Sequence, residues 1–216
     1  MPYAFPEGSS FYFSEDFAAP KTITVMTNAS PTVATSVAHG FVDGDELVLA
    51  SGWEDASDSV FKADALTADT FSLLDLDTTS TQFYTPGGGA NSTVRKILSW
   101  TEIPQVLTTS TSGGDPKYTT ISPLARRNAI NVPTGFNATS VTLTLGHDPS
   151  LANYKTLVGI SRRLAPVAFK MRLSGGYVSY GYGYVGVSEQ PSLNVGQANQ
   201  VTATFTLLGR SMSYAS

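Results

Sequence analysis

The stretch from Val167 to Val185, VAFKMRLSGGYVSYGYGYV, constrains the fold of this chain more than any other. Two runs of alternating residues flank Gly175 and Gly176, and glycine readily adopts the positive φ angles that a two-residue β-turn requires. The pattern therefore predicts a β-hairpin. With the turn at these two glycines, Phe169 lies opposite Tyr182, and every other cross-strand pair follows from that register.

The predicted register gives the hairpin one apolar and one polar face. The face expected to be buried carries Val167, Phe169, Met171, Leu173, Val178, Tyr180, Tyr182 and Tyr184. The face expected to meet water or a partner carries Ala168, Lys170, Arg172, Ser174, Tyr177, Ser179, Gly181 and Gly183. A slip of one residue would exchange the two faces, so burial of the apolar face should hold the register firmly.

Composition narrows the function classes. The chain has 216 residues, of which 41% are hydrophobic and only 14% charged, with a formal net charge of −4. This balance is typical of a globular protein with a Ser- and Thr-rich surface, and it argues against a dedicated nucleic-acid binder. The absence of cysteine excludes disulfides and thiolate metal sites. We expect no signal peptide and no membrane span, because no suitable apolar run is present.

Turn signals and composition divide the chain into three predicted segments. Residues 1–20 form an arm whose aromatic cluster should dock on its own core or on a neighbouring subunit. Residues 21–96 contain short strands at close spacing, which is typical of a small all-β sandwich or barrel. Residues 97–216 form a β-sandwich core with one helix, at about 149–164. The predicted fold class is mainly β: a sandwich or barrel core, one flanking α-helix and a small all-β inserted domain.

Within the third segment, local signals place the helix and a loop. Asp148 is the expected N-cap and Pro149 the first helical residue, while Pro166 should end the helix. Its apolar positions recur at helical spacing, at Leu151, Tyr154, Leu157, Val158 and Leu164. Residues 97–107 are a long strand candidate interrupted by Pro104, and the polar stretch 108–116 is expected to be a flexible loop tip.

The search for catalytic chemistry is negative. His39 and His147 are far apart in the sequence and are best explained as structural residues, and Asp43 and Asp45 as turn residues. Gly181, Gly183 and Gly186 match G-x-G-x-x-G, but they lie inside a strand, where glycine instead permits close approach of another backbone. We predict no enzymatic activity, no cofactor and no metal site.

One alternative function remains open at this point. Tyr177, Tyr180, Tyr182 and Tyr184 could stack on sugars or bases, although most of them are expected to be core residues. An exposed tyrosine platform would instead indicate a carbohydrate-binding β-sandwich module, or a tail-fibre or adhesin domain.

The order of several segments resembles the major tail tube proteins of long-tailed, non-contractile bacteriophages. The resemblance begins with the short aromatic N-terminal arm and covers nearly the whole chain. It rests on TVATSVAHGFVDGDELVLASGW (32–53), DTFSLLDLDTTSTQFYTPGGGANSTVRK (69–96), SWTEIPQVLTTSTSGGDPKY (99–118), VTLTLGHDPSLANYKTL (141–157) and VTATFTLLGR (201–210).

This resemblance implies a structural virion protein of the tail, assembled in the host cytoplasm. Its subunits would form hexameric rings that stack into a tube through which viral DNA passes without specific binding. Its partners would be other copies of itself, the tape measure, tail terminator and distal tail proteins, and no membrane. Residues 21–96 would lie on the tube exterior.

The resemblance also suggests which residues make contacts. Candidates for contacts between rings or subunits come from the arm and from the predicted loop 108–115: Phe11, Tyr12, Phe13, Thr108, Ser112, Gly113, Gly114 and Asp115. Candidates that face the lumen or a neighbour are Lys170, Arg172, Thr202, Thr204 and Thr206. The resemblance also implies a negative lumen, which the two cations would oppose unless nearby carboxylates or an acidic residue of a neighbouring subunit compensate them.

Overall fold

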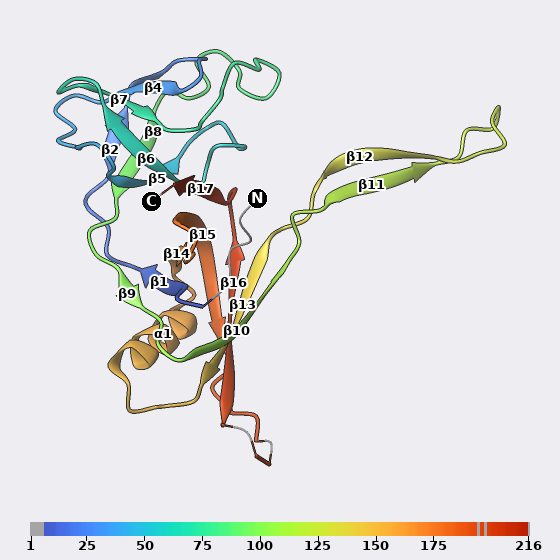
Figure 1. The fold of residues 1–216 in the computed structure, drawn as a ribbon. Coiled ribbons are helices and arrows are strands. Elements are labelled where there is room, and N and C mark those ends of the chain that lie inside the picture. The colour runs from blue at the N-terminus through green and yellow to red at the C-terminus, as the bar shows by residue number, and fades with distance from the viewer. Residues whose placement is uncertain (1–6, 194, 197, 216) are drawn as a thin grey trace.

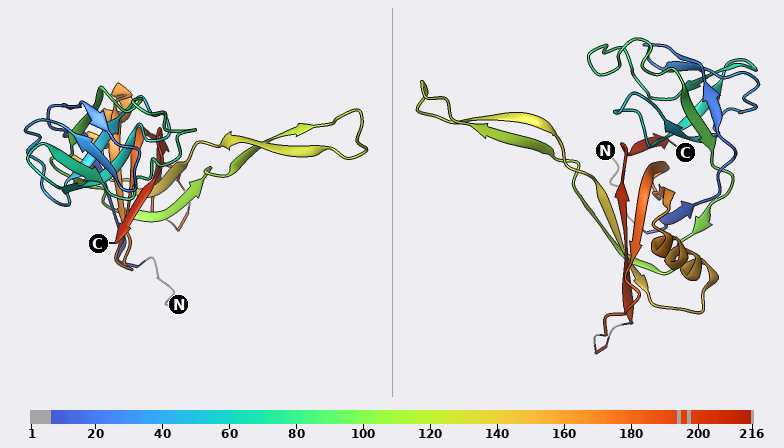
Figure 2. Two further views of the ribbon diagram at one scale, coloured as in Figure 1. Left: turned by 90° about the horizontal axis from the view of Figure 1, so that it is seen from above. Right: turned by 180° about the vertical axis from the view of Figure 1, so that it is seen from behind.

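A computed structural model describes residues 7–193, 195–196 and 198–215 of the chain. Two large sheets lie next to each other, one helix packs on the larger sheet, and a long two-stranded hairpin projects away from both (Figure 1). The same arrangement is visible from above and from behind in Figure 2. The chain is mainly β with a single helix among the described residues, which confirms the predicted fold class.

The larger sheet contains strands from both ends of the chain. Its order is β10-β13-β16-β15-β14-β1-β9, and β17 also pairs with β15. The strands are β1 (Ser10–Ser14), β9 (Thr101–Glu102), β10 (Val106–Ser112), β13 (Ser140–Gly146), β14 (Pro166–Arg172), β15 (Tyr177–Val187), β16 (Gln200–Leu207) and β17 (Met212–Ala215). One face carries alternating apolar residues from β13, β14 and β16, which form the main core with β1 and helix α1 (Ala152–Arg163).

The smaller sheet is built entirely between Lys21 and Lys96. Its order is β2-β8-β5-β6-β7-β4-β3. Only Thr24 separates the first and last strands of this path, so the sheet curls into a small barrel around Trp53, Phe61 and Phe71. The strands are β2 (Lys21–Ile23), β3 (Val25–Met26), β4 (Thr32–Thr35), β5 (Glu46–Ala50), β6 (Ser59–Ala65), β7 (Thr70–Leu73) and β8 (Ser92–Lys96).

The β14–β15 hairpin exists, but its predicted register is wrong by one residue. Phe169 pairs with Gly181 rather than with Tyr182. The loop contains three residues, Ser174 to Gly176, and Gly176 has a φ of 84°. A type I turn followed by a left-handed glycine is a common three-residue hairpin loop, and it shifts the pairing by one position relative to a two-residue turn.

The register change moves the tyrosines to the opposite face from Phe169. Val167 and Phe169 belong to the main core, whereas Ala168, Val178, Tyr180 and Tyr182 pack toward the small barrel. Both faces of this hairpin are therefore covered, so the expected division into one buried and one polar face is wrong. A strand covered on both faces does not need an alternating pattern.

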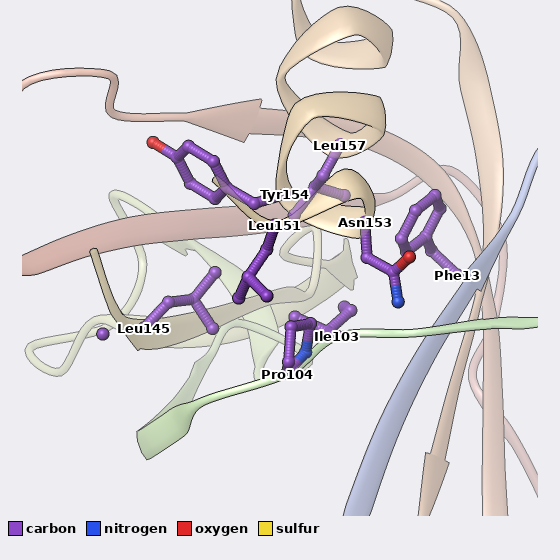
Figure 3. A pocket seen from close by; sticks show the side chains of 9 residues that line it. Phe13, Ile103, Pro104, Leu145, Leu151, Asn153, Tyr154 and Leu157 are labelled. Atoms are coloured by element: carbon purple, nitrogen blue, oxygen red, sulfur yellow. The ribbon is translucent and has the colours of Figure 1, made fainter. Parts of the chain in front are cut away.

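The helix begins later than predicted. Asp148 is not its N-cap: its carboxylate accepts hydrogen bonds from the backbone N–H (2.9 Å) and the hydroxyl (2.6 Å) of Ser150. This local turn leaves Leu151 as the N-cap, in an extended conformation. At the other end Leu164 is left-handed and 73% exposed, which corrects its assignment to the apolar face. Figure 3 shows Leu151, Tyr154 and Leu157 of this region above Leu145, Ile103 and Pro104.

The predicted strand 97–107 and loop 108–116 are also corrected. Pro104 separates the two-residue strand β9 from β10, and β10 continues through Ser112. The chain then leaves the sheet as β11 (Pro116–Ile121) and returns as β12 (Ile130–Phe136), so the loop tip lies at 122–129. We call β11, β12 and their connecting loop the long hairpin.

Candidate assembly surfaces

Strands β10, β13 and β16 present an uncovered face made of hydroxyl side chains. Paired residues on neighbouring strands share a face, and the pairs here match threonine or serine with threonine or serine along all three strands. Thr142 and Thr204 are in hydrogen-bond contact at 3.1 Å, and Ser112 and Ser140 at 2.9 Å. We call this surface the hydroxyl face; it consists of Thr108, Ser110, Ser112, Ser140, Thr142, Thr144, Thr202, Thr204 and Thr206.

The hydroxyl face is hydrated but uncharged. Its side chains are exposed or half-buried, and none of them is ionisable near neutral pH. The opposite side of β13 and β16 holds Leu143, Ala203 and Phe205 in the main core. Core packing therefore fixes which side chains point outward, and none of the side chains of the hydroxyl face carries a charge that would attract or repel an ion.

The same face of the sheet is covered where it continues onto β14 and β15. The tyrosine face, as we call it, consists of Ala168, Lys170, Val178, Tyr180, Tyr182 and Tyr214, and the small barrel packs on it. Lys170 Nζ lies 3.2 Å from Glu46 Oε1 of strand β5, and each side chain is 18% exposed. The hydroxyl of Tyr180 donates to the same Glu46 oxygen at 2.5 Å, and the indole N–H of Trp100 donates to the other.

Aromatic rings surround the Lys170 ammonium. It lies 4.2 Å from the centroid of the Trp100 ring, with Tyr12 and Tyr180 further out. Burial lowers the pKa of Lys170, and the Glu46 carboxylate partly counters that effect. Burial together with the Glu46 charge raises the pKa of Tyr180. The acidic residue that compensates the charge of Lys170 is therefore Glu46 of the same chain.

Two further contacts hold the small barrel on the tyrosine face. Arg95 of β8 donates to the Tyr182 hydroxyl at 3.0 Å and lies 4.7 Å from the ring centroid of Phe17. Tyr214 of β17 donates from its hydroxyl to the Leu74 carbonyl at 3.0 Å. Burial raises the pKa of Tyr214 to about 12. The junction thus combines apolar burial with satisfied polar groups, as buried polar atoms require.

The long hairpin is the most exposed part of the described chain. Every residue of β11 is exposed, as is nearly every residue of β12. At its base Gly113 and Gly114 have φ angles of 83° and 79°, and a Cβ on Gly113 would lie 1.9 Å from the Ala138 carbonyl oxygen. The ribbon therefore turns away from the sheet at a place where only glycine fits.

The structure separates the predicted contact residues into different settings. Phe11 and Phe13 are buried in the chain's own core through pairing of β1 with β14, and only Tyr12 of that cluster is half-buried. Thr108 and Ser112 lie in β10 on the hydroxyl face, not in a loop. Gly113, Gly114 and Asp115 form the base of the long hairpin. The first six residues of the arm lie outside the described residues.

The residues that were predicted to face the lumen or a neighbouring subunit also lie in different settings. Thr202 and Thr206 are exposed and Thr204 is half-buried, all on the hydroxyl face. Lys170 is held by Glu46, whereas Arg172 at the end of β14 is exposed. Sequence reasoning missed Glu46 and Arg95, because their partners are distant in the chain and no local pattern connects them.

Other sequence motifs have structural explanations. The ring of His39 accepts from the Phe41 N–H at 2.9 Å and contacts the Thr67 carbonyl at 3.0 Å. Asp45 accepts from the Val42 N–H and pairs with Lys96 at 2.7 Å. A Cβ on Gly183 would lie 2.0 Å from the Thr206 carbonyl oxygen, which confirms the predicted close backbone approach.

Three further features of the described residues bear on the predicted absence of a metal site, a sugar platform and a membrane span. No group of three or more His, Asp or Glu side chains among them is placed to hold a metal ion. The cavity in Figure 3, lined by Phe13, Leu145 and Tyr154 among others, is apolar and about 10 Å³, roughly the room that one water needs. Tyr180 and Tyr182 are buried, so they provide no platform for sugars. No helix of the described chain is long and apolar enough to cross a membrane.

Comparison with known proteins identifies the family. A family model described as phage tail tube protein matches residues 51–216, so this chain belongs to the phage tail tube protein family. The match begins directly after β5 and includes β6, β7 and β8 of the small barrel. It confirms the resemblance to tail tube proteins and indicates a structural role in the tail of the virion.

Among solved structures, the hybrid solid-state NMR and cryo-EM structure of the SPP1 tail tube is similar to this chain. The TM-score is 0.43 and the sequence identity 14%, over 55% of this chain and 69% of that chain. A comparison with curated proteins found no match.

Proposed function

We propose that this protein is the repeating subunit of a phage tail tube, in which hexameric rings stack into a conduit for DNA ejection. The observation that carries the proposal is the family match over residues 51–216. The subunit acts by shape and surface chemistry, without catalysis. Its partners are other copies of itself and, at the ends and interior of the tube, the tape measure, tail terminator and distal tail proteins. It assembles in the host cytoplasm and remains in the virion.

The hydroxyl face is the proposed lumen lining, with Thr202, Thr204 and Thr206 at its centre. Uncharged hydroxyl groups remain hydrated and form no fixed ion pairs with phosphates, so DNA can slide past them. Electrostatic attraction to the backbone dominates non-specific protein–DNA affinity, and its absence here favours passage over retention. Lys170 does not contribute to this lining, because Glu46 holds it against the small barrel.

The free edge of the larger sheet supports a closed ring. β10 ends the strand order, so one row of its backbone N–H and C=O groups has no strand partner within the described chain. Exposed edges promote association with other strands, and closure into a ring removes them. We propose that neighbouring subunits continue the sheet at this edge, which places the hydroxyl faces around one channel.

The small barrel, residues 21–96, is proposed to lie on the tube exterior. It covers the tyrosine face and leaves the hydroxyl face open. The arm and the long hairpin are proposed to contact neighbouring subunits or rings. An isolated two-stranded hairpin is only marginally stable in water, and the exposure of this one indicates that another molecule covers it in the assembled state.

Electron microscopy of the purified protein tests the proposal. We expect hollow tubes or hexameric rings in negative stain, and a helical reconstruction should place the hydroxyl face at the lumen. A protein that stays monomeric at high concentration across a range of salts would contradict the assignment.

A hairpin deletion provides the matched variant for this test. Replacing residues 116–136 by two glycines joins Asp115 to Asn137, which are already linked by a hydrogen bond between the Asn137 N–H and the Asp115 carbonyl at 3.0 Å. The shortened chain should fold, with a thermal unfolding midpoint close to that of the wild type, but fail to form tubes. Tubes of normal length from this variant would remove the long hairpin from the assembly mechanism.

A further inference from the structure

The long hairpin has a charge opposite to that of the rest of the chain. Residues 116–139 contain Lys117, Arg126 and Arg127 but no Asp or Glu, so this segment carries +3. The formal charge of the whole chain is −4, so the remainder carries −7. Two of the three cations lie in the loop at the tip, and no ion pair within the described chain includes either arginine.

The tip is also apolar. Leu124 is fully exposed, and Ile121 and Tyr118 on the adjoining strand are about half exposed. Pro123 precedes Leu124 and its carbonyl accepts from the Arg126 N–H, which gives the loop a local turn. The tip therefore presents an apolar side chain next to two guanidinium groups, a combination that typically gains stability when a partner covers it.

An acidic groove lies at the other end of the hairpin, between its base and the small barrel. Two adjoining hollows, of about 620 and 530 Å³, share Asp55, Gly135, Phe136 and Arg210. Glu54 lines the first hollow and Asp77 the second, whereas Arg210 is already paired with Asp55 at 3.1 Å. Hydrogen bonds from Thr79 lower the pKa of Asp77, so this carboxylate stays ionised.

Exposed aromatic residues accompany these carboxylates. Phe136 is 72% exposed and Phe83 is 60% exposed, and both line the second hollow. The groove thus combines apolar surface with net negative charge, which complements the composition of the tip. Complementary charge with apolar contact at the centre is the usual chemistry of a specific protein interface.

The tip of one chain does not reach the groove of the same chain. The groove contacts the base of the hairpin, and each of its strands spans about 20 Å, since a residue in a strand advances about 3.3 Å. Figures 1 and 2 show the loop at the far end of the hairpin, remote from both sheets. If the tip of one molecule binds the groove of a second molecule, the tip of the second is free to bind a third. Such a head-to-tail contact repeats from subunit to subunit.

We propose that the long-hairpin tip of one copy, with Leu124, Arg126 and Arg127, docks into the groove lined by Glu54, Asp77 and Phe83 on a second copy. This inference rests on the proposed tube assembly and names the surface that receives the hairpin. Each subunit is both donor and acceptor, so the contact continues from one subunit to the next. Because the attraction is partly ionic and exposed to solvent, added salt weakens it.

Cysteine cross-linking tests the docking directly, because the natural chain contains no cysteine. The variants Leu124→Cys and Ser80→Cys are mixed, assembled and oxidised; Ser80 is exposed and lines the second hollow. We expect a covalent dimer. The control pairs Leu124→Cys with Ala152→Cys, which is exposed at the start of α1. Equal cross-linking of the two pairs would overturn the proposal.

Charge reversal gives an independent test. Arg126→Glu with Arg127→Glu should reduce assembly about tenfold, and Glu54→Lys with Asp77→Lys should do the same. Mixing both variants should restore association through the reversed pairs. Lys155→Glu, on an exposed position of α1, is the control and should assemble normally. Circular dichroism of each variant verifies that it is folded.

The outcomes separate the two levels of inference. If the wild type forms tubes but the arginine variant assembles as well as the wild type, the docking is wrong and the tube function stands. If the wild type stays monomeric under all conditions, the proposed function is wrong and the docking with it. Tubes whose hairpins cross-link to another tail protein, and not to Ser80→Cys, would also overturn the docking.

Discussion

One face of the larger sheet is covered by the small barrel on one half and uncovered on the other half. On β14 and β15 it carries tyrosines and a half-buried lysine, and the small barrel covers it. On β10, β13 and β16 it carries mainly threonine and serine, with Gly146 and Gln200 at one end, and nothing in the described chain covers it. The tyrosine face is therefore completed within the chain, whereas the hydroxyl face is available to an external partner.

The two halves of this face carry different types of side chain, according to whether the small barrel covers them. Contact with the chain's own barrel uses large rings, a shared carboxylate and specific hydrogen bonds, as at Glu46. The hydroxyl face, which we propose as the lumen lining, instead carries small uncharged groups that form no ion pairs with DNA. Four experiments test this difference between the two halves of the face.

The largest effect is expected from Phe169→Ala, which damages the core behind both halves. The Phe169 side chain is 3% exposed and its ring stacks on Phe205 at a centroid distance of 4.5 Å. We expect the free energy of unfolding to fall by about 3–5 kcal/mol in urea denaturation. Arg172→Ala, on the other face of the same strand, should change it by less than about 0.5 kcal/mol. Equal effects would show that our assignment of faces is wrong.

The next effect is expected from Glu46→Ala at the covered half. The substitution leaves the Lys170 ammonium half-buried without its counter-ion and removes the acceptor for Tyr180 and Trp100. We expect a loss of about 2 kcal/mol. The matched control is Glu189→Ala, which breaks the exposed pair with Arg162 and should have little effect. A stable Glu46 variant would mean that apolar contact alone holds the barrel in place.

Alkaline pH should also weaken the contact between the small barrel and the tyrosine face. The folded pKa values of Tyr180 and Tyr214 are raised above the ordinary value of 10.0. Their contribution to stability is therefore complete below pH 10 and lost as the pH rises through the folded values. The lowered pKa of Lys170 acts in the opposite sense and reduces the penalty for its burial as the pH approaches 10.5. Tyrosinate absorbance should rise together with unfolding, and Tyr214→Phe should move the midpoint to higher pH.

The smallest effect on stability is expected at the hydroxyl face. Replacing the exposed Thr202 and Thr206 with lysine should change the free energy of unfolding by no more than about 0.5 kcal/mol for each substitution. Tubes built from this double variant should retain DNA in a filter assay, whereas wild-type tubes should not. Tyr182→Lys on the covered half is the counterpart and should destabilise the fold. If the threonine variant unfolds, the hydroxyl face has an intramolecular partner.

Much of the strand pattern was predictable because strand alternation is local. Alternation in the sequence predicts strands at 10–14 and 46–50, which match β1 and β5. It also predicts strands at 141–145 and 201–208, which differ from β13 and β16 by one residue at each end. β8 was missed because the glycine-rich stretch before it indicates a loop, and β12 was missed because Pro133 and Gly135 interrupt its strand pattern. The hairpin register failed because Ser174 joins the turn, and the two loop lengths share the same glycine pair.

The assembly surfaces were only partly predictable. The threonine alternation of β16 is visible in the sequence, and so are the candidates Thr202, Thr204 and Thr206. The sequence does not show that the small barrel covers the tyrosine face, because Glu46 and Lys170 are brought together only when the barrel packs on the sheet. The acidic groove is likewise assembled from five separate parts of the chain.

The pairing of β1 with β14 has a consequence for synthesis on the ribosome. Strand β1 emerges first, yet its partner follows only after the whole small barrel and the long hairpin have been made. The barrel closes through pairings confined to residues 21–96 and can fold as soon as that part has emerged. Non-local strand pairing is slow, and N-terminal units generally fold first. The larger sheet, with its hydroxyl face, can therefore form only after β16 has been made, well after the barrel.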